Sequence, residues 1–253
     1  MLPIIKYIIL NGVRDRLYIG LMLLIIASIS LSIVIGSTFM IEQRQTTLIF
    51  SAAVTRLFFI IGFILFVCIT LNRSFENKEI EFILSKSISR YKIILSYMIG
   101  YITSAIIILT PIMLTLYIIA NINITGLATW SITMLLETLI VIIFSIVAAL
   151  ILNNIFTSIL VTICFYTLSR MVGVFVLTAS IAENIQQFSD NSMMSILKAI
   201  SVLFPRIDLF SQSEWLIYGV ENFDNLSIII IQSIIYISLL SLMAFYDFKR
   251  KQF

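Results

Sequence analysis

The stretch IILSYMIGYITSAIIILTPIMLTLYIIANINITGLATWSITMLL fills residues 93–136 without one charged side chain. A helix rises about 1.5 Å per residue and needs about 20 apolar residues to cross the hydrocarbon core of a bilayer. The stretch is therefore too long for a single crossing. The turn-forming residues NINITG at 121–126 divide it, so it predicts two membrane-spanning helices that fold back on each other.

The remainder of the chain is nearly as apolar. Hydrophobic residues make up 60% of the 253 residues and charged residues 11%, whereas a soluble domain carries about 25% charged residues. We expect a single all-α integral membrane domain over residues 1–253, with six transmembrane helices. The expected spans are 17–38, 53–72, 92–120, 130–151, 155–178 and 226–246.

Three segments lie outside these expected spans. Residues 1–16 predict an interfacial helix, because basic residues flank a short apolar stretch. Residues 76–88 predict a second amphipathic helix, and residues 179–225 form the largest loop. Within that loop, apolar residues at helical spacing over 193–204 predict a further amphipathic or re-entrant helix.

Basic residues gather at one set of span ends. If the N-terminus is cytoplasmic, eleven lysines and arginines lie on the cytoplasmic side. Four lie on the other side, namely Arg44, Arg56, Lys198 and Arg206. Because basic loops stay in the cytoplasm, we expect both termini and residues 73–92 to be cytoplasmic.

Glu137 and Arg170 interrupt otherwise uncharged stretches. A charge at mid-bilayer costs about 2.5–3.5 kcal/mol on insertion scales, so each needs a partner or water. The midpoint between the two positions falls at Asn153–Asn154, where a tight turn would join two antiparallel helices. The two charges would then lie at the same height, toward the outer leaflet. We predict a Glu137–Arg170 ion pair, which is either a staple that fixes the hairpin or part of a substrate path or outer gate.

The segment 76–88 is amphipathic when it is placed on a helix. Ile80, Ile83 and Leu84 share one face, and charged residues occupy the other. Phe75 and Phe82 are seven residues apart and fall together on the charged side. A charged loop of this kind can be a solvated connection. Aromatic rings on a charged face favour a partner whose groove receives them.

The same region resembles the first cytoplasmic loop of ABC-2 type transporter permeases. The resemblance is carried by the run EFILSKSISRYKIILSYMIGY at 81–101, which continues from acidic residues into the third expected span. The matching positions are Glu76 or Glu79 for the acidic lead, Leu84–Ser85, and Ser89–Arg90. The chain departs from the pattern in two places. It has Ser87 where the family often has proline, and it has Ile80–Glu81 where the family usually has Gly-Thr.

This resemblance implies a function. The loop would be a coupling helix that docks into a separate ABC ATPase subunit, which binds ATP-Mg and drives export. Two permease copies, identical or not, would pair with two ATPase subunits among the lipids of a bacterial cytoplasmic (inner) membrane. The implied docking residues are Phe75, Glu76, Glu79, Phe82, Leu84 and Arg90.

Several chemistries are not expected of the chain itself. Histidine is absent, the two cysteines lie in apolar runs, and no phosphate-binding Gly-x-x-x-x-Gly-Lys-Ser/Thr motif occurs. We therefore expect no enzyme activity, cofactor, metal site or nucleic-acid partner in this chain. The alternative function is a membrane assembly or maturation factor without transport activity. An intramembrane enzyme has less support, because Glu137 and Arg170 at equal depth neutralise each other.

Overall fold

The computed structural model describes residues 2–14, 17–38, 43–85, 88–120, 124–152, 154–184, 204–219 and 223–251. Within these ranges nearly every residue is helical and no strand occurs. The elements are α1 (Leu2–Arg14), α2 (Leu17–Ser37), α3 (Gln43–Glu76), α4 (Glu79–Ser85), α5 (Arg90–Ala120), α6 (Ile124–Leu152), α7 (Ile155–Asn184), η1 (Ile207–Leu209), α9 (Trp215–Tyr218) and α10 (Phe223–Arg250).

Six of these helices are long and apolar enough to cross a membrane, which confirms the expected number. They are α2, α3, α5, α6, α7 and α10. The helices extend beyond most of the expected spans. The largest difference is in α3, which begins at Gln43 instead of at residue 53. Hydropathy marks only the part of a helix that suits the hydrocarbon core, and polar residues such as glutamine and arginine continue a helix well.

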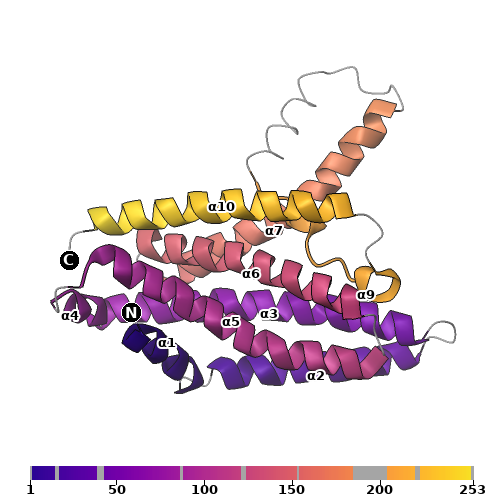
Figure 1. The fold of residues 1–253 in the computed structure, drawn as a ribbon, viewed down its shortest axis with the longest axis horizontal. Helices are drawn as coiled ribbons and strands as arrows, with labels where there is room; N and C mark the ends of the chain where they lie inside the picture. Colours follow the sequence, from indigo (N-terminus) through magenta and orange to yellow (C-terminus); the bar gives the residue numbers. More distant parts are fainter. Residues whose placement is uncertain are drawn as a thin grey trace.

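The long helices lie in one bundle, from which the last part of α7 projects (Figure 1). In α3, α5 and α6, the inner set, more than half of the residues in the most apolar stretch of the helix are buried. In α2, α7 and α10, the outer set, less than a third of them are buried. The outer helices expose large apolar side chains such as Leu23, Leu160 and Leu242. An apolar outer surface of this kind suits lipid tails.

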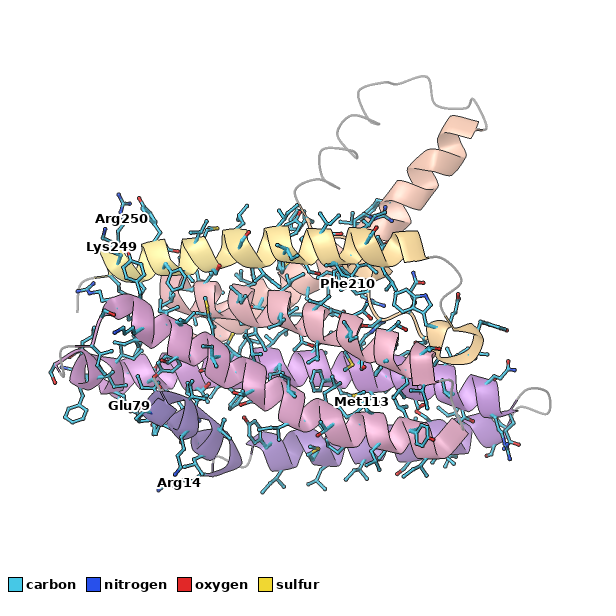
Figure 2. All side chains as sticks on the ribbon, in the orientation of Figure 1. Arg14, Glu79, Met113, Phe210, Lys249 and Arg250 are labelled. Atoms are coloured by element: carbon cyan, nitrogen blue, oxygen red, sulfur yellow. The ribbon has the colours of Figure 1, made fainter. Side chains whose placement is uncertain are left out.

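The two ends of the bundle differ in what they carry. One end holds α4 together with both ends of the chain, and we call it the α4 end (Figure 1). Glu79, Lys249 and Arg250 lie there (Figure 2). The other end holds α9, and we call it the α9 end. The short segment 204–219, with η1 and α9, packs there against α7, α6 and α3.

The helices observed outside the spans differ in part from the expected ones. The N-terminal helix is present as α1 and packs against α5, where Ile4 and Ile8 are buried. The expected helix over 76–88 is shorter, because α3 continues to Glu76 and α4 covers only Glu79–Ser85. Lys78 has a left-handed backbone with φ of 56°, which ends α3 and separates the two helices. The expected helix over 193–204 falls almost wholly in residues 185–203, which lie outside the described residues.

Candidate functional site

The helix α4 is a short projection at the α4 end. Its residue Ile80 is 1% exposed and fixes it to the bundle, whereas Phe82 is 63% exposed. Glu79 and Glu81 lie in its first turn. Beside it lies an apolar cavity of about 610 Å³, lined by Ile4 and Tyr7 of α1 and by residues of α4 and its flanking turns.

Phe75 does not share the exposed face of Phe82, contrary to the expectation. The turn at Asn77–Lys78 interrupts the helix, so Phe75 belongs to the last turn of α3. Its ring is half-buried, and the Lys251 ammonium lies 4.2 Å from the ring centroid. The two aromatic side chains therefore have different roles: Phe75 packs inside the bundle end and Phe82 projects from it.

Arg90 is also used within the chain. Its Nη1 atom donates hydrogen bonds to the backbone carbonyls of Phe248 (3.4 Å), Lys249 (3.1 Å) and Lys251 (2.9 Å). These carbonyls end α10, where a cation is stabilised by the helix dipole. Arg90 thus caps α10 within the chain. Of the other implied docking residues, Glu76 is exposed, while Glu79 and Leu84 are half-buried.

Lys251 completes this set of contacts at the α4 end. Its Nζ donates a 2.9 Å hydrogen bond to the carbonyl of Leu150 at the end of α6. Partial burial lowers the pKa of the Lys251 ammonium. The Lys251 side chain therefore links the ends of α3, α6 and α10, which stabilises the end of the bundle from which α4 projects.

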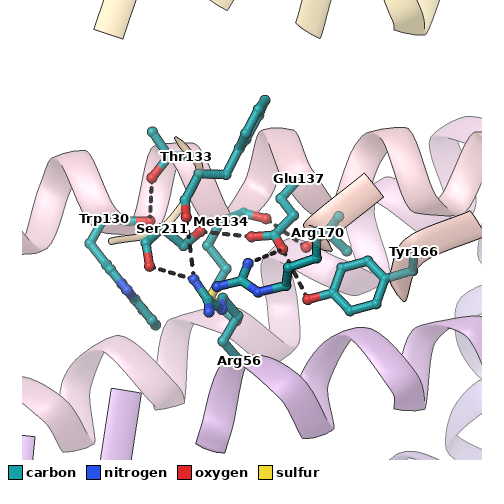
Figure 3. Close-up of polar contacts among 10 residues, drawn as sticks. Arg56, Trp130, Thr133, Met134, Glu137, Tyr166, Arg170 and Ser211 are labelled. Atoms are coloured by element: carbon teal, nitrogen blue, oxygen red, sulfur yellow. Dashed lines mark hydrogen bonds and ion pairs between the residues drawn. The ribbon is translucent and has the colours of Figure 1, made fainter. Parts of the chain in front are cut away.

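A second group of polar side chains lies inside the bundle, toward the α9 end. The structure contains the expected ion pair, with Arg170 Nη1 of α7 at 3.5 Å from Glu137 Oε1 of α6 (Figure 3). Glu137 is 0% exposed. Its Oε1 also accepts a 3.1 Å hydrogen bond from the Tyr166 hydroxyl, and its Oε2 accepts one of 2.9 Å from the Ser211 hydroxyl. Both carboxylate oxygens are thus satisfied.

Arg56 is the residue that the sequence analysis misplaced. It is counted with the basic residues of the outer side although it falls within the expected span 53–72, and in the structure it lies within α3 and is 8% exposed. Its Nη1 donates hydrogen bonds to the carbonyls of Ser211 (2.6 Å) and Phe210 (3.3 Å). The sequence did contain a signal for a buried charge. Arg56 is a single charged residue at the start of a long apolar run, and Glu137 is likewise a single charged residue in an apolar stretch. We call Arg56, Glu137, Tyr166, Arg170 and Ser211 the charged cluster.

The segment 204–219 closes this cluster at the α9 end. Phe210 and Ser211 are fully buried, and Ser211 has a left-handed backbone with φ of 48°. The segment approaches α6 so closely that a Cβ atom at Gly126 would lie 2.1 Å from the carbonyl oxygen of Trp215. Glycine at this position is therefore what allows the segment to dock.

No protein-family model matches the chain, and no curated protein shows significant sequence similarity to it. The structure thus presents two candidate sites: the projecting α4 with Phe82, and the charged cluster. Of the residues singled out from the sequence, Glu137 and Arg170 come together, while Phe75 and Arg90 are held within the bundle. Arg56, Tyr166 and Ser211 were not anticipated.

Proposed function

We propose that the chain is the membrane-spanning permease subunit of an ATP-driven ABC-2 type transporter. It works as an exporter in a bacterial cytoplasmic membrane, and α4 is the helix that docks into a separate nucleotide-binding subunit. The observation that carries this proposal is the exposure of Phe82 on a short acidic helix, in a loop whose sequence resembles the coupling region of such permeases.

The exposure of Phe82 suits a contact with another protein. Phe82 lies outside every helix that is long enough to span a membrane, and it lines the apolar cavity between α4 and α1. Burying a phenylalanine side chain contributes about 1.5–3 kcal/mol, which makes it a useful anchor for another protein. Glu79 and Glu81 add negative charge beside it, which suits a groove with a basic rim.

The position of α4 allows a movement there to reach the rest of the molecule. It stands between α3 and α5, which are two of the three inner helices. At a rise of about 1.5 Å per residue, α3 is about 50 Å long and carries Arg56 about 30 Å from the α4 end. A displacement of α4 by a nucleotide-dependent partner would therefore be transmitted along α3 to the charged cluster.

The interior of one copy favours a substrate path between two copies. Phe63, Phe66 and Tyr101 pack edge to face in the core, with ring centroids 6.1 and 5.4 Å apart. All three are at most 2% exposed. This part of the bundle is filled by side chains, so two copies that pair in the membrane would form the pathway along their shared surface.

The test compares two phenylalanines at the same end of the molecule. The chain is purified in mild detergent from its native cell, co-purifying proteins are identified by mass spectrometry, and the ATPase activity of the complex is measured. We expect a nucleotide-binding subunit at about one copy per chain. Phe82→Ala should reduce its retention and the complex-dependent ATPase activity by about tenfold or more, the loss typical of an interface hot spot.

Phe156→Ala is the matched control. Phe156 lies in the first turn of α7, next to the α6–α7 turn, and is 82% exposed. The variant therefore removes an exposed phenylalanine side chain, as Phe82→Ala does, but leaves α4 unchanged. It should leave the ATPase activity unchanged. Equal losses in both variants, or a partner that hydrolyses no nucleotide, would refute the permease proposal. The second of these results would support an assembly or maturation role instead.

A further inference from the structure

We propose that Arg56 and Arg170 form a binding site for a phosphate oxyanion, either as the headgroup of an anionic lipid-like molecule or as free phosphate. The site goes beyond the docking function at α4 and can be tested without it. The charge balance, the hydrogen-bond donors and the surroundings of the charged cluster each support this inference.

The first argument is the charge balance. Two guanidinium groups and one carboxylate share the cluster, so one positive charge is left over. Glu137 attracts Arg56 electrostatically and Arg170 repels it, which places all three within range of one another. Among the described residues, Asp208 on the segment 204–219 pairs through Oδ2 with Arg206 at 3.1 Å, so this pair adds no net charge, and its Oδ1 is buried without a hydrogen-bond partner. A buried excess charge is costly unless a counter-ion accompanies it.

The second argument is the set of hydrogen-bond donors that the protein leaves unused. Arg56 Nε, Arg170 Nη1 and Trp130 Nε1 are buried and have no hydrogen-bond partner among the described residues. Arg170 Nη1 has only the 3.5 Å ion pair to Glu137, which is longer than a good hydrogen bond. Buried donors without partners are rare, and at a cationic centre they fit an anionic acceptor.

The acceptors that Arg56 does have are weak substitutes for an anion. They are the neutral backbone carbonyls of Phe210 and Ser211. Ser211 holds its carbonyl there in a left-handed backbone conformation, which is unfavourable for a residue with a Cβ atom. Two guanidinium groups from different helices can instead bind different oxygens of one tetrahedral phosphate, each through charge-assisted hydrogen bonds.

The surroundings of Arg170 favour a ligand with an apolar part. The Arg170 side chain is 33% exposed, although its Nη1 atom is buried, so Arg170 is the member of the cluster that extends to the surface beside α7. Met171 and Phe175, further along α7, are about half exposed and apolar. A phosphate attached to acyl chains could place its headgroup at Arg170 while the chains lie along α7.

The experiment measures anion binding by the purified full-length chain in neutral detergent without nucleotide. Thermal unfolding midpoints are followed by fluorescence of Trp130 and Trp215, the two tryptophans of the chain, while three probes are titrated. The probes are phosphatidylglycerol, zwitterionic phosphatidylcholine and inorganic phosphate. We expect phosphatidylglycerol to raise the midpoint and phosphatidylcholine not to. A rise with inorganic phosphate as well would show that the oxyanion alone is sufficient, and a rise with phosphatidylglycerol only would show that the acyl chains are required.

Three variants locate the site. Arg170→Gln should weaken phosphatidylglycerol binding by about tenfold, whereas Arg44→Gln, an equal charge change at an exposed position of α3, should not. Glu137→Gln removes the competing carboxylate and should tighten binding by about tenfold. A structural staple without an anion site predicts no tightening, so this variant tests the proposal even if Arg170→Gln does not fold.

Two results would overturn the inference. One is a wild-type midpoint that responds to neither anion. The other is equal binding in the wild type, Arg170→Gln and Glu137→Gln. The ATPase tests at α4 do not enter these measurements, so the failure of either proposal is distinguishable from failure of the other.

Discussion

Arg56 donates a 2.6 Å hydrogen bond to the backbone carbonyl of Ser211, which is 155 positions further along the chain. The contact joins the inner helix α3 to the segment 204–219 at the α9 end. The Ser211 hydroxyl in turn donates to Glu137 on α6. The segment 204–219 is thus held by side chains of two inner helices, and changes in any of these residues should be felt in the others.

The hydroxyl of Ser211 should contribute measurably to stability. Ser211→Ala leaves Oε2 of the fully buried Glu137 without its hydrogen bond, so we expect a loss of about 1–3 kcal/mol in the free energy of unfolding. Ser238→Ala on the exposed face of α10 removes a hydroxyl that bonds only within its own helix, and should change the stability by less than about 0.5 kcal/mol. Chemical unfolding in detergent micelles measures both. Equal effects would show that the Ser211–Glu137 bond contributes nothing specific.

Exchanging the charges of Glu137 and Arg170 should not restore the wild-type state. An isolated ion pair tolerates such an exchange, but this pair has neighbours. An arginine at position 137 would face the like charge of Arg56, and the Tyr166 and Ser211 hydroxyls would lose the carboxylate that accepts their hydrogen bonds. We expect the double variant Glu137→Arg/Arg170→Glu to yield less than half of the wild-type monodisperse protein by size-exclusion chromatography. Full recovery in the double variant, after loss in each single variant, would show that the pair acts as an independent staple.

Arg90 should matter for the end of α10 and not for docking. Arg90→Gln removes the cation that bonds the last carbonyls of α10, and we expect a loss of about 1 kcal/mol, expressed as faster amide exchange in the last turn of that helix. The complex-dependent ATPase activity should stay at the wild-type level. A variant that loses the ATPase partner while α10 exchanges normally would show that Arg90 belongs to the docking surface after all.

Lys251 should give the α4 end a pH dependence at alkaline pH. Its folded-state pKa is lowered by burial, below the ordinary value of 10.5, so the unfolded chain binds its proton more tightly. Stability therefore rises with pH through the interval between the folded-state pKa and 10.5. The expected contribution is small, because the group is only partly buried. The difference between the wild type and Lys251→Met, measured by unfolding at a series of pH values, should change in this interval and nowhere below it.

The sequence predicts the bundle well because long uncharged runs are a direct consequence of the bilayer. The same logic places Glu137 and Arg170 together, since their positions are symmetric about the α6–α7 turn. It fails for Arg56, because this residue lies near the start of the expected span 53–72 and was assigned to the outer side by its charge. Ser211 could not be found at all, since its role depends on a contact across 155 positions and on an unusual backbone conformation. The break at Lys78 was missed for a related reason, because a left-handed lysine has no sequence signal.

The length and planar geometry of the Arg56 side chain, and not only its charge, should hold the segment 204–219 in place. Arg56→Lys keeps the positive charge but offers a compact ammonium, which is not expected to reach the Phe210 and Ser211 carbonyls with the geometry of the guanidinium. We expect the amides of η1 and α9 to exchange about tenfold faster with solvent, because their docking is weakened. Arg44→Lys, in the exposed first turn of α3, should leave this exchange unchanged. Exchange that is equally slow in both variants would show that the charge alone holds the segment. In that case we would also expect Arg56→Lys to bind phosphatidylglycerol as the wild type does.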